Sequence, residues 1–470
     1  MRSSGAFSFH LGLGAVVFTA TGVVAWAQDA PSFRYQPALR PVAALPRATW
    51  YPPGVEAPLP VAPVVVSPTA GRQREEVYVP LALRRLRQRN FAFGTSRDAF
   101  TIRAPGGVLA QLRLGVQTEF RATDNVNSAP STTALSDEIL DVTPIARLSI
   151  GGVPGLQPER STDPAPYLDA LYAPTSHQLL RGGTYAFLQH LLVQAGRATP
   201  VAHTGVRFAY DENTFASSSD SSAEENYNVL ETGPVIDYRM SAKTAVHFRG
   251  DYRRITLDDA SGNRSELAGD ARLDCELSVK TTAGIGAAAG HITFDRTDFG
   301  TQDYWQGFVT LAWKATEKLS FRTQAGVELR EFTRALPKAD HVSPVAVAVL
   351  DWRATERTRV AAAFRVQNQP SVEQSGSLFR ETKFAFEAQH DISASFYARA
   401  ELEYARRAYD TGRLETEVTV RPAVGCQLVS GAAFDSVKLE VFYQFRRHWH
   451  SGAGGDYDRN QAGVQLTAFF

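Results

Sequence analysis

The stretch "LRLGVQTEFRA", residues 112–122, alternates between two kinds of side chain. In an extended strand, successive side chains point to opposite faces of the sheet. One face carries small and apolar residues, which are Leu112, Leu114, Val116, Thr118, Phe120 and Ala122. The other face carries mainly polar and charged residues, which include Arg113, Gln117, Glu119 and Arg121. This period of two predicts a β-strand with one face toward apolar surroundings and the other toward water.

The same two-faced pattern returns along most of the chain. Clear examples are "TAVHFRGDYRRI" (244–255), "LSFRTQAGVELREF" (319–332), "SFYARAELEYARR" (395–407) and "SVKLEVFYQFRR" (436–447). The chain holds about 18 candidate strands of roughly 10–13 residues, the length that a tilted strand needs to cross a bilayer. Soluble strands are usually about five or six residues long. The predicted fold class is therefore all-β, a closed antiparallel transmembrane β-barrel of about 16–18 strands.

The end of the chain fits such a barrel. The last stretch, "QAGVQLTAFF" (461–470), has a small or apolar residue at every second position. A free edge of this kind would leave unpaired backbone groups open to aggregation. We therefore expect the last strand to pair with the first and close the cylinder.

The lengths of the connections alternate as well. Tight turns are expected at "RMSAK" (239–243), "KATEK" (314–318), "RATER" (353–357) and "HDIS" (390–393). Longer polar joins lie between them, such as "DENTFASSSDSSAEE" (211–225), "NQPSVEQSGS" (368–377) and "RHWHSGAGGDYD" (447–458). Short periplasmic turns and long extracellular loops are typical of outer-membrane barrels.

Aromatic residues lie near both kinds of connection. Those beside the short turns are Tyr238, Trp313, Trp352 and Phe396, and those beside the long loops are Phe120, Tyr210, Tyr252 and Phe294. We expect them to form two girdles at the membrane interfaces, although core aromatics of a soluble β-protein would mimic part of this pattern.

The N-terminal region divides into two parts. Residues 1–27 hold Arg2, an apolar run and the triplet Ala25-Trp26-Ala27, which predicts a cleaved secretory signal peptide. An uncleaved membrane anchor is the alternative, but the apolar run is short for a spanning helix. Residues 28–106 are rich in proline and are expected to form a largely disordered periplasmic tail or linker. The barrel is expected over residues 107–470.

The composition narrows the chemistry. The chain has 49 basic and 49 acidic residues, so nothing in its charge indicates nucleic acid as a partner. Cys275 and Cys426 are expected to be free thiols on the outward face. His448 and His450 are a candidate pair of metal ligands without a third ligand nearby, and no catalytic motif is present, so we expect no enzyme activity, no cofactor and no metal.

A barrel of this size generally encloses a water-filled channel. Its polar faces carry the residues predicted to line the lumen, which are Arg113, Glu119, Arg249, Asp251, Arg253, Arg322, Glu328, Arg359, Arg365, Glu387, Arg399, Glu401 and Glu403. These side chains either border a diffusion path or form cross-strand pairs that stiffen the wall, and we expect most to do the second. No preference for cations or anions follows.

Three stretches carry a family resemblance. "LRLGVQTEFRATDNVNSA" (112–129), "SDEILDVTPIARLSI" (136–150) and "TGPVIDYRMSAKTAVHFRGDYRRITLDD" (232–259) resemble the β-barrel porin type 2 family of Gram-negative bacteria, over about residues 107–470. The long join at 151–166 departs from that family. The terminal Phe470 resembles the signal read by the barrel-assembly machinery, which the resemblance implies as a partner.

These features predict a porin-like channel of the outer membrane for passive diffusion of small hydrophilic solutes, in contact with outer-membrane lipid. The alternative is a non-conducting scaffold or surface-loop display barrel, or a component of polysaccharide export or assembly. An energy-coupled transporter is less favoured because it usually has about 22 strands and a folded plug.

Overall fold

The structure, a computed structural model, describes residues 100–103, 109–125, 136–151, 165–183, 185–199, 201–213, 227–257, 263–296, 300–333, 341–371, 378–431, 434–451 and 456–469. The predicted signal peptide, nearly all of the proline-rich segment and Phe470 lie outside these residues. The predictions made for them stay predictions.

The described chain forms one antiparallel sheet of 21 strands. The first ten are β1 (Phe100–Arg103), β2 (Leu109–Thr123), β3 (Asp137–Gly151), β4 (Ala165–Tyr172), β5 (Thr175–Leu179), β6 (Tyr185–Leu188), β7 (His190–Ala198), β8 (Ala202–Asn213), β9 (Tyr227–Arg239) and β10 (Thr244–Leu257). The others are β11 (Arg264–Ser278), β12 (Thr281–Phe294), β13 (Thr301–Lys314), β14 (Leu319–Thr333), β15 (His341–Arg353), β16 (Thr358–Pro370), β17 (Leu378–Asp391), β18 (Phe396–Tyr409), β19 (Leu414–Gly431), β20 (Phe434–His450) and β21 (Tyr457–Phe469).

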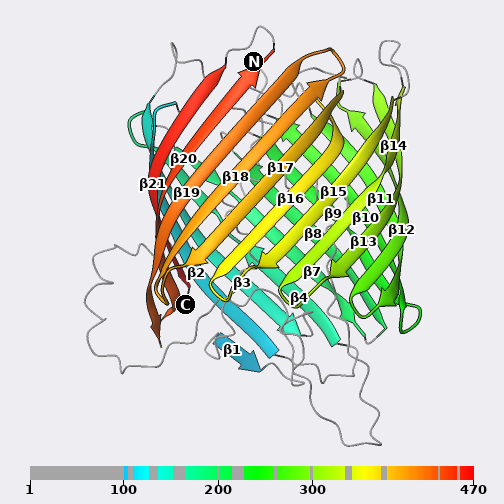
Figure 1. Cartoon of the computed structure of the whole chain (residues 1–470), viewed down its shortest axis with the longest axis horizontal. Coiled ribbons are helices and arrows are strands. Elements are labelled where there is room, and N and C mark those ends of the chain that lie inside the picture. Colours follow the sequence, from blue (N-terminus) through cyan, green and yellow to red (C-terminus); the bar gives the residue numbers. More distant parts are fainter. Residues whose placement is uncertain are drawn as a thin grey trace, which may run out of the picture. The chain divides into compact units, whose positions relative to one another are not determined.

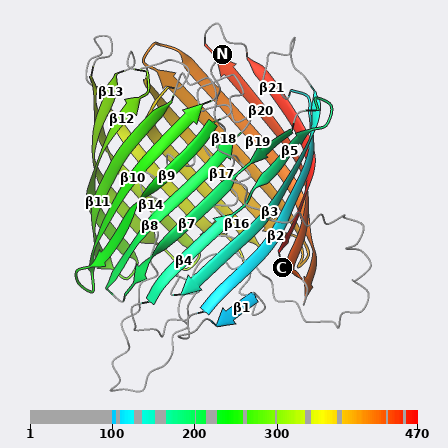
Figure 2. The ribbon, with the colours of Figure 1, turned by 180° about the vertical axis from the view of Figure 1, so that it is seen from behind.

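The sheet closes on itself. Residues 115–123 of β2 pair with residues 461–469 of β21, while the other edge of β2 pairs with β3. Figures 1 and 2 show the resulting cylinder from opposite sides. If β4 and β5 are counted as one strand, β6 and β7 as one, and the short β1 is left out, 18 strands cross the barrel wall. The closed antiparallel barrel and this strand number confirm the predicted fold class.

Two of the crossings are broken near the middle of the wall. β4 and β5 lie end to end along β3, which pairs with β4 at Ala146–Gly151 and with β5 at Ile139–Val142. Pro174 lies between β4 and β5, and proline cannot donate a ladder hydrogen bond. β6 and β7 follow the same division, since β6 pairs with β5 and β7 pairs with β4.

The short strand β1 extends the edge that β21 leaves. β21 ends at Phe469, opposite Gly115 of β2. Beyond that point, β1 pairs with residues 109–112 of β2. A strand therefore forms inside the segment predicted as tail, because the start of β2 has no other partner on that edge.

Side chains alternate between the two sides of the wall as the sequence predicts. Large apolar residues are exposed on the outward side, including Leu267, Ile285, Val309, Val327, Val424 and Val441. The inward side carries buried charged and polar residues, including Arg249, Asp270, Glu328, Arg365 and Glu440. The apolar surface is therefore on the outside and the polar one inside, the reverse of a soluble β-protein.

The predicted outward girdle of aromatic residues is confirmed at the short-turn end of the barrel. At the long-loop end the prediction is wrong for Phe294. Tyr238, Trp313, Trp352 and Phe396 are all exposed outward. Phe294 is buried and packs inward with Ile292 and Tyr304. The alternation along β12 explains this, because Ile285 is outward and Phe294 is nine residues further on. Cys275 and Cys426 are free and not buried, as predicted.

Inward aromatic rings lie over glycines of the neighbouring strand. A Cβ added to Gly290 would lie 2.3 Å from Cζ of Tyr304, and one added to Gly286 would lie 2.4 Å from Cε2 of Phe308. The absent side chains make room for the rings against the wall. The aromatic residues of β13 therefore require glycine at these two positions of β12.

Uninterrupted crossings range from the 12 residues of β8 to the 18 of β19, and most are longer than the predicted 10–13. Strand pairing continues past the apolar band into the polar ends. No helix long and apolar enough to cross a membrane occurs among the described residues.

Candidate functional site

Three arginine doublets lie toward the long-loop ends of strands. They are Arg253-Arg254 in β10, Arg406-Arg407 in β18 and Arg446-Arg447 in β20. Because strand side chains alternate, each doublet sends one guanidinium inward and the other outward. The inward members, Arg253, Arg407 and Arg446, each lie within ion-pair distance of a carboxylate. They belong to four groups of inward ion pairs and hydrogen bonds, or arcs, which together we call the charged belt.

The first arc of the charged belt joins β8, β9, β10 and β11. Glu231 accepts a hydrogen bond from Arg207 at 2.6 Å and one from Arg253 at 3.3 Å. Arg253 also lies 3.8 Å from Glu266, which accepts a hydrogen bond from the hydroxyl of Tyr304 at 2.8 Å. Cations and carboxylates thus alternate from strand to strand.

The second arc joins β13, β14 and β16. Arg330 Nε donates to Glu328 at 2.9 Å, and Arg330 Nη1 donates to Gln302 at 2.9 Å. Asn368 Nδ2 donates to the same Glu328 carboxylate at 3.0 Å. Arg330 and Glu328 are fully buried. A buried ion pair of this kind is tolerated only when further hydrogen bonds surround it.

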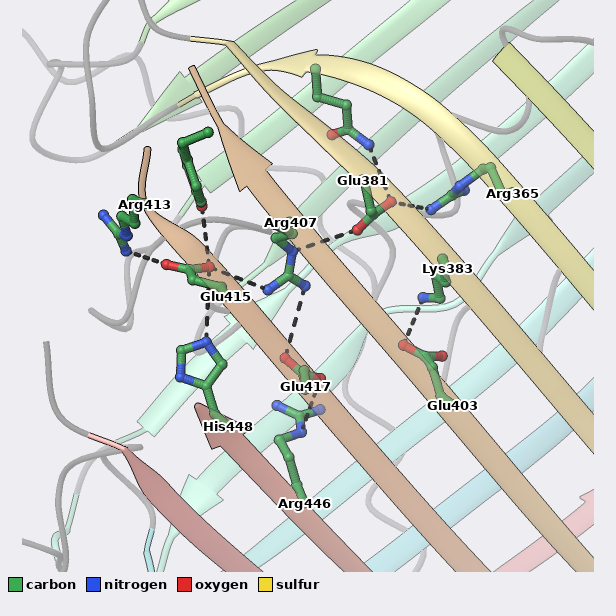
Figure 3. Close-up of polar contacts among 12 residues, drawn as sticks. Arg365, Glu381, Lys383, Glu403, Arg407, Arg413, Glu415, Glu417, Arg446 and His448 are labelled. Carbon is green, nitrogen blue, oxygen red and sulfur yellow. Dashed lines mark hydrogen bonds and ion pairs between the residues drawn. The ribbon is translucent and has the colours of Figure 1, made fainter. Parts of the chain in front are cut away.

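The third arc runs from β16 to β20 and is drawn in Figure 3. Arg365 donates to Glu381 at 2.7 Å, and Arg407 lies 3.5 Å from the same carboxylate. Arg407 also lies 3.6 Å from Glu415 and 3.8 Å from Glu417. In the figure, Arg407 stands between the carboxylates of β17 and β19 and links the two strands.

A fourth arc covers the strands near the closure. Arg121 of β2 lies 2.6 Å from Glu119 and 2.9 Å from Asp141 of β3. Asp141 is also 2.5 Å from Nδ1 of His177 in β5. Strands β2, β3 and β5 therefore also contribute charged pairs to the inward face.

The structure places the sequence-predicted lumen residues on the inward face. Seven are buried, which are Arg113, Glu119, Arg249, Arg253, Glu328, Arg365 and Arg399. Five are half-buried, which are Asp251, Arg322, Glu387, Glu401 and Glu403. Arg359 is exposed near a short turn, 2.5 Å from Asp351. Their role in lining a pore stays a prediction.

Three of these residues, Asp251, Arg322 and Glu387, make no ion pair among the described residues. Arg322 of β14 lies opposite Ala312 on one side and Val349 on the other. Glu387 of β17 lies opposite Ala361 and opposite another acidic residue, Glu401. Asp251 and Glu387 nevertheless interact electrostatically with arginines of the wall, Asp251 with Arg253 and Glu387 with Arg399. Charges outside an ion pair are less constrained by the wall than the paired charges of the belt.

The sequence prediction missed many members of the belt. These include Arg207, Glu231, Glu266, Glu381, Arg407 and Arg446. Alternation alone would place each of them on a polar face. Alternation does not give the cross-strand register, and it is the register that brings Glu231 within ion-pair distance of both Arg207 and Arg253.

A second polar cluster lies toward the short-turn end of β4, β8, β9, β10 and β11. Asp237 is 3.1 Å from Nδ1 of His203 and 2.7 Å from Nδ1 of His247. Nε2 of His203 is 2.5 Å from the hydroxyl oxygen of Tyr167, and Nε2 of His247 is 3.3 Å from the carboxylate of Asp274. This unbroken row joins the strands at this level of the wall.

The candidate metal pair also lies inward. Nε2 of His448 and Nε2 of His450 lie 3.8 Å and 3.6 Å from the carboxylate of Glu415. That carboxylate already accepts hydrogen bonds from Arg413 and from the hydroxyl of Tyr409. Within the described part of the chain, no group of three or more His, Cys, Asp and Glu residues is arranged to hold a metal ion.

No protein-family model and no curated protein matches the sequence. Solved structures similar to the chain include OccK3 (OpdO) of Pseudomonas aeruginosa, at 13% identity and a TM-score of 0.44, covering 77% of this chain and 95% of that one. OpdK of the same organism, solved with vanillate, has 10% identity and a TM-score of 0.45, covering 77% and 99%. OccAB3 of Acinetobacter baumannii has 7% identity and a TM-score of 0.44, covering 77% and 99%. The fold assigned to this chain rests on its own strand pairing.

Proposed function

We propose that the protein is an outer-membrane channel through which small hydrophilic solutes diffuse passively. The observation that carries this proposal is the inversion of the wall, with large exposed apolar residues outside and charged residues inside a closed cylinder. Hydrocarbon around the barrel requires both features, because it cannot satisfy a free strand edge or a charge.

The size of the barrel supports a pore. Barrels of about eight strands fill their interior with their own side chains, whereas barrels of about 16–18 strands leave an aqueous channel. With 18 crossings, this chain belongs to the second class. The charged belt helps to keep such a channel open, because its arginines are held by carboxylates of neighbouring strands on the wall.

The finer predictions belong to this proposal. The chain would be exported by its signal peptide, inserted by the barrel-assembly machinery through Phe470, and classed with the β-barrel porin type 2 family. The short-turn end would face the periplasm, and the long-loop end would face outward. Fixed charges in the pore would act on passing ions without binding a cofactor.

A second candidate function, a non-conducting scaffold barrel, has one observation in its favour. Arg330 and Glu328 are fully buried, and Gln302 and Asn368 beside them are buried as completely. Polar side chains therefore fill part of the interior near β13–β16. If this filling extends across the whole interior, the barrel passes no ions.

The unpaired charges Arg322 and Glu387 allow the channel to be tested by ion selectivity. In a planar bilayer with a salt gradient, Arg322→Glu should move the reversal potential toward cation preference, and Glu387→Arg should move it toward anion preference. Arg406→Glu is the matched control, because Arg406 is exposed on the outward face. Identical reversal potentials in all three variants and the wild type would reject the proposed lumen.

A further inference from the structure

The outward members of the arginine doublets differ in how they are paired. Arg254 donates to Asp295 at 2.6 Å, and Arg447 lies 3.5 Å from Asp458. Arg406 has no carboxylate within ion-pair distance among the described residues. Another outward arginine, Arg380 of β17, is in the same situation. Both side chains are exposed.

Arg380 and Arg406 lie close together on neighbouring strands. Arg406 is opposite Thr382, and Arg380 is opposite Ala408, so the two arginines form a diagonal pair on the outward face. Diagonal neighbours on one face of a sheet are about 7–8 Å apart, within reach of long side chains. The two guanidinium groups are able to reach one shared anion.

Hydroxyl groups flank the arginines on both sides. Thr382 of β17 and Thr416 of β19 lie directly opposite Arg406. Both threonines share the outward face, because the alternation sends Glu381, Glu415 and Glu417 inward. We call the surface formed by Arg380, Thr382, Arg406 and Thr416 the outer arginine site. Every side chain in it donates hydrogen bonds, and none is a carboxylate.

The surroundings of this site are those of a membrane interface. Phe384 and Tyr404, a directly paired couple, follow Thr382 and Arg406 on the side away from the long-loop end. Arg380 is the third residue of β17, and Arg406 lies near the end of β18. The nearby Asp410 accepts a hydrogen bond from the backbone N–H of Leu378 at 3.2 Å. Aromatic residues gather at the level of lipid headgroups.

We propose that the outer arginine site binds a phosphate group of a lipid in the leaflet at the long-loop end. Arginine matches phosphate oxygens with paired, charge-assisted hydrogen bonds, and two guanidinium groups with flanking hydroxyls surround one such group. A lipid phosphate also supplies the negative charge that no described carboxylate supplies to Arg380 or Arg406. This inference rests on the proposed membrane location of the barrel.

The test uses the full chain purified in detergent and native mass spectrometry. The probes are a bis-phosphorylated acyl disaccharide, its dephosphorylated form and inorganic phosphate. The wild type should bind the phosphorylated lipid about tenfold more tightly than the dephosphorylated form. Arg380→Gln/Arg406→Gln should lose this preference, whereas the control Arg254→Gln should keep it, because Arg254 is already bonded to Asp295.

Three results would overturn the lipid site. They are a wild type without preference for the phosphorylated lipid, a double variant that keeps the preference, and inorganic phosphate binding as tightly as the lipid. Conductance of the same samples separates this inference from the proposed function. The double variant should conduct as the wild type does, since both substitutions lie on the outward face, so a lost preference with normal conductance supports the site alone.

Discussion

Two arginines that are adjacent in the sequence serve different surfaces of this protein. In "EYARRAY" (403–409), Arg406 is exposed on the outward face and Arg407 lies between Glu381, Glu415 and Glu417 on the inward face. The cause is the two-residue period of the strand. A substitution of Arg406 therefore changes the outward surface, and a substitution of Arg407 changes the internal ion pairs.

The internal pairs should dominate stability. Arg365 and Glu381 have side chains that are only 7% and 2% exposed, and their atoms lie 2.7 Å apart. Removing Arg365 takes away the nearest partner of the buried Glu381, which keeps only the more distant Arg407 as an ion-pair partner. Breaking a buried ion pair typically costs about 3–5 kcal/mol, and the remaining Arg407 places this case toward the lower end of that range. We predict a loss of this size in the unfolding free energy of Arg365→Gln, measured by urea titration in detergent or lipid.

The control for this prediction is Arg322→Gln. Arg322 is half-buried and has no ion-pair partner among the described residues, so its loss should change the unfolding free energy by no more than about 0.5 kcal/mol. Arg365→Gln/Glu381→Gln should recover part of the loss, because the Glu381 charge is removed as well and Arg407 keeps Glu415 and Glu417 as partners. Equal stability of Arg365→Gln and Arg322→Gln would contradict a structural role for the belt.

At the scale of single strands, the sequence predicted most of the wall and failed where a strand is broken. β2, β10, β14, β18 and β20 show uninterrupted alternation, and the structure has each of them. β4 and β5 form one crossing in two pieces because Pro174 interrupts the ladder. Nearness to a loop predicts an outward Phe294, whereas the alternation along β12 places it inward.

The pairing of β2 with β21 is the element on which closure depends. Thr118 of β2 lies opposite Leu466 of β21, and both are outward residues. Directly paired positions have Cα separations of about 4.5–5.5 Å, within the range that a disulfide spans. We predict that Thr118→Cys/Leu466→Cys forms an internal disulfide under mild oxidation, detected as altered mobility of the unfolded protein in non-reducing gels.

The single variant Thr118→Cys is its control. It keeps the native Cys426, which lies in β19 and is separated from β2 by β20 and β21. No internal disulfide should form there, because cysteines with Cα atoms more than about 7 Å apart cannot be bridged without backbone movement. Absence of the link in the double variant would mean that β2 and β21 are not neighbours in solution.

At the scale of the whole molecule, the equal numbers of basic and acidic residues, 49 of each, are reflected in the pairing of charges inside the barrel. Many of these charges pair with one another on the inward face, so the interior holds charge without a large excess of either sign. Sequence patterns predicted the two faces, the closure and the alternating loops. They did not predict which charges pair, because register is set only when all the strands align.

The same reason limits how far the candidate site was predictable. Arg322 and Arg365 have the same sequence context, a single arginine on the polar face of a strand. Only their cross-strand neighbours differ, since Arg365 meets Glu381 while Arg322 lies between Ala312 and Val349. In the proposed channel, the paired residues stiffen the wall and the unpaired ones act on solutes.

Conductance across a planar bilayer containing the chain from residue 28 onward shows directly whether the barrel is an open channel. If the barrel of about 16–18 strands encloses an aqueous lumen, the current should rise in discrete steps. The size of each step should be proportional to the applied voltage. Protein that is folded and inserted in the bilayer, yet passes no current, would contradict the channel and favour a scaffold whose interior is filled.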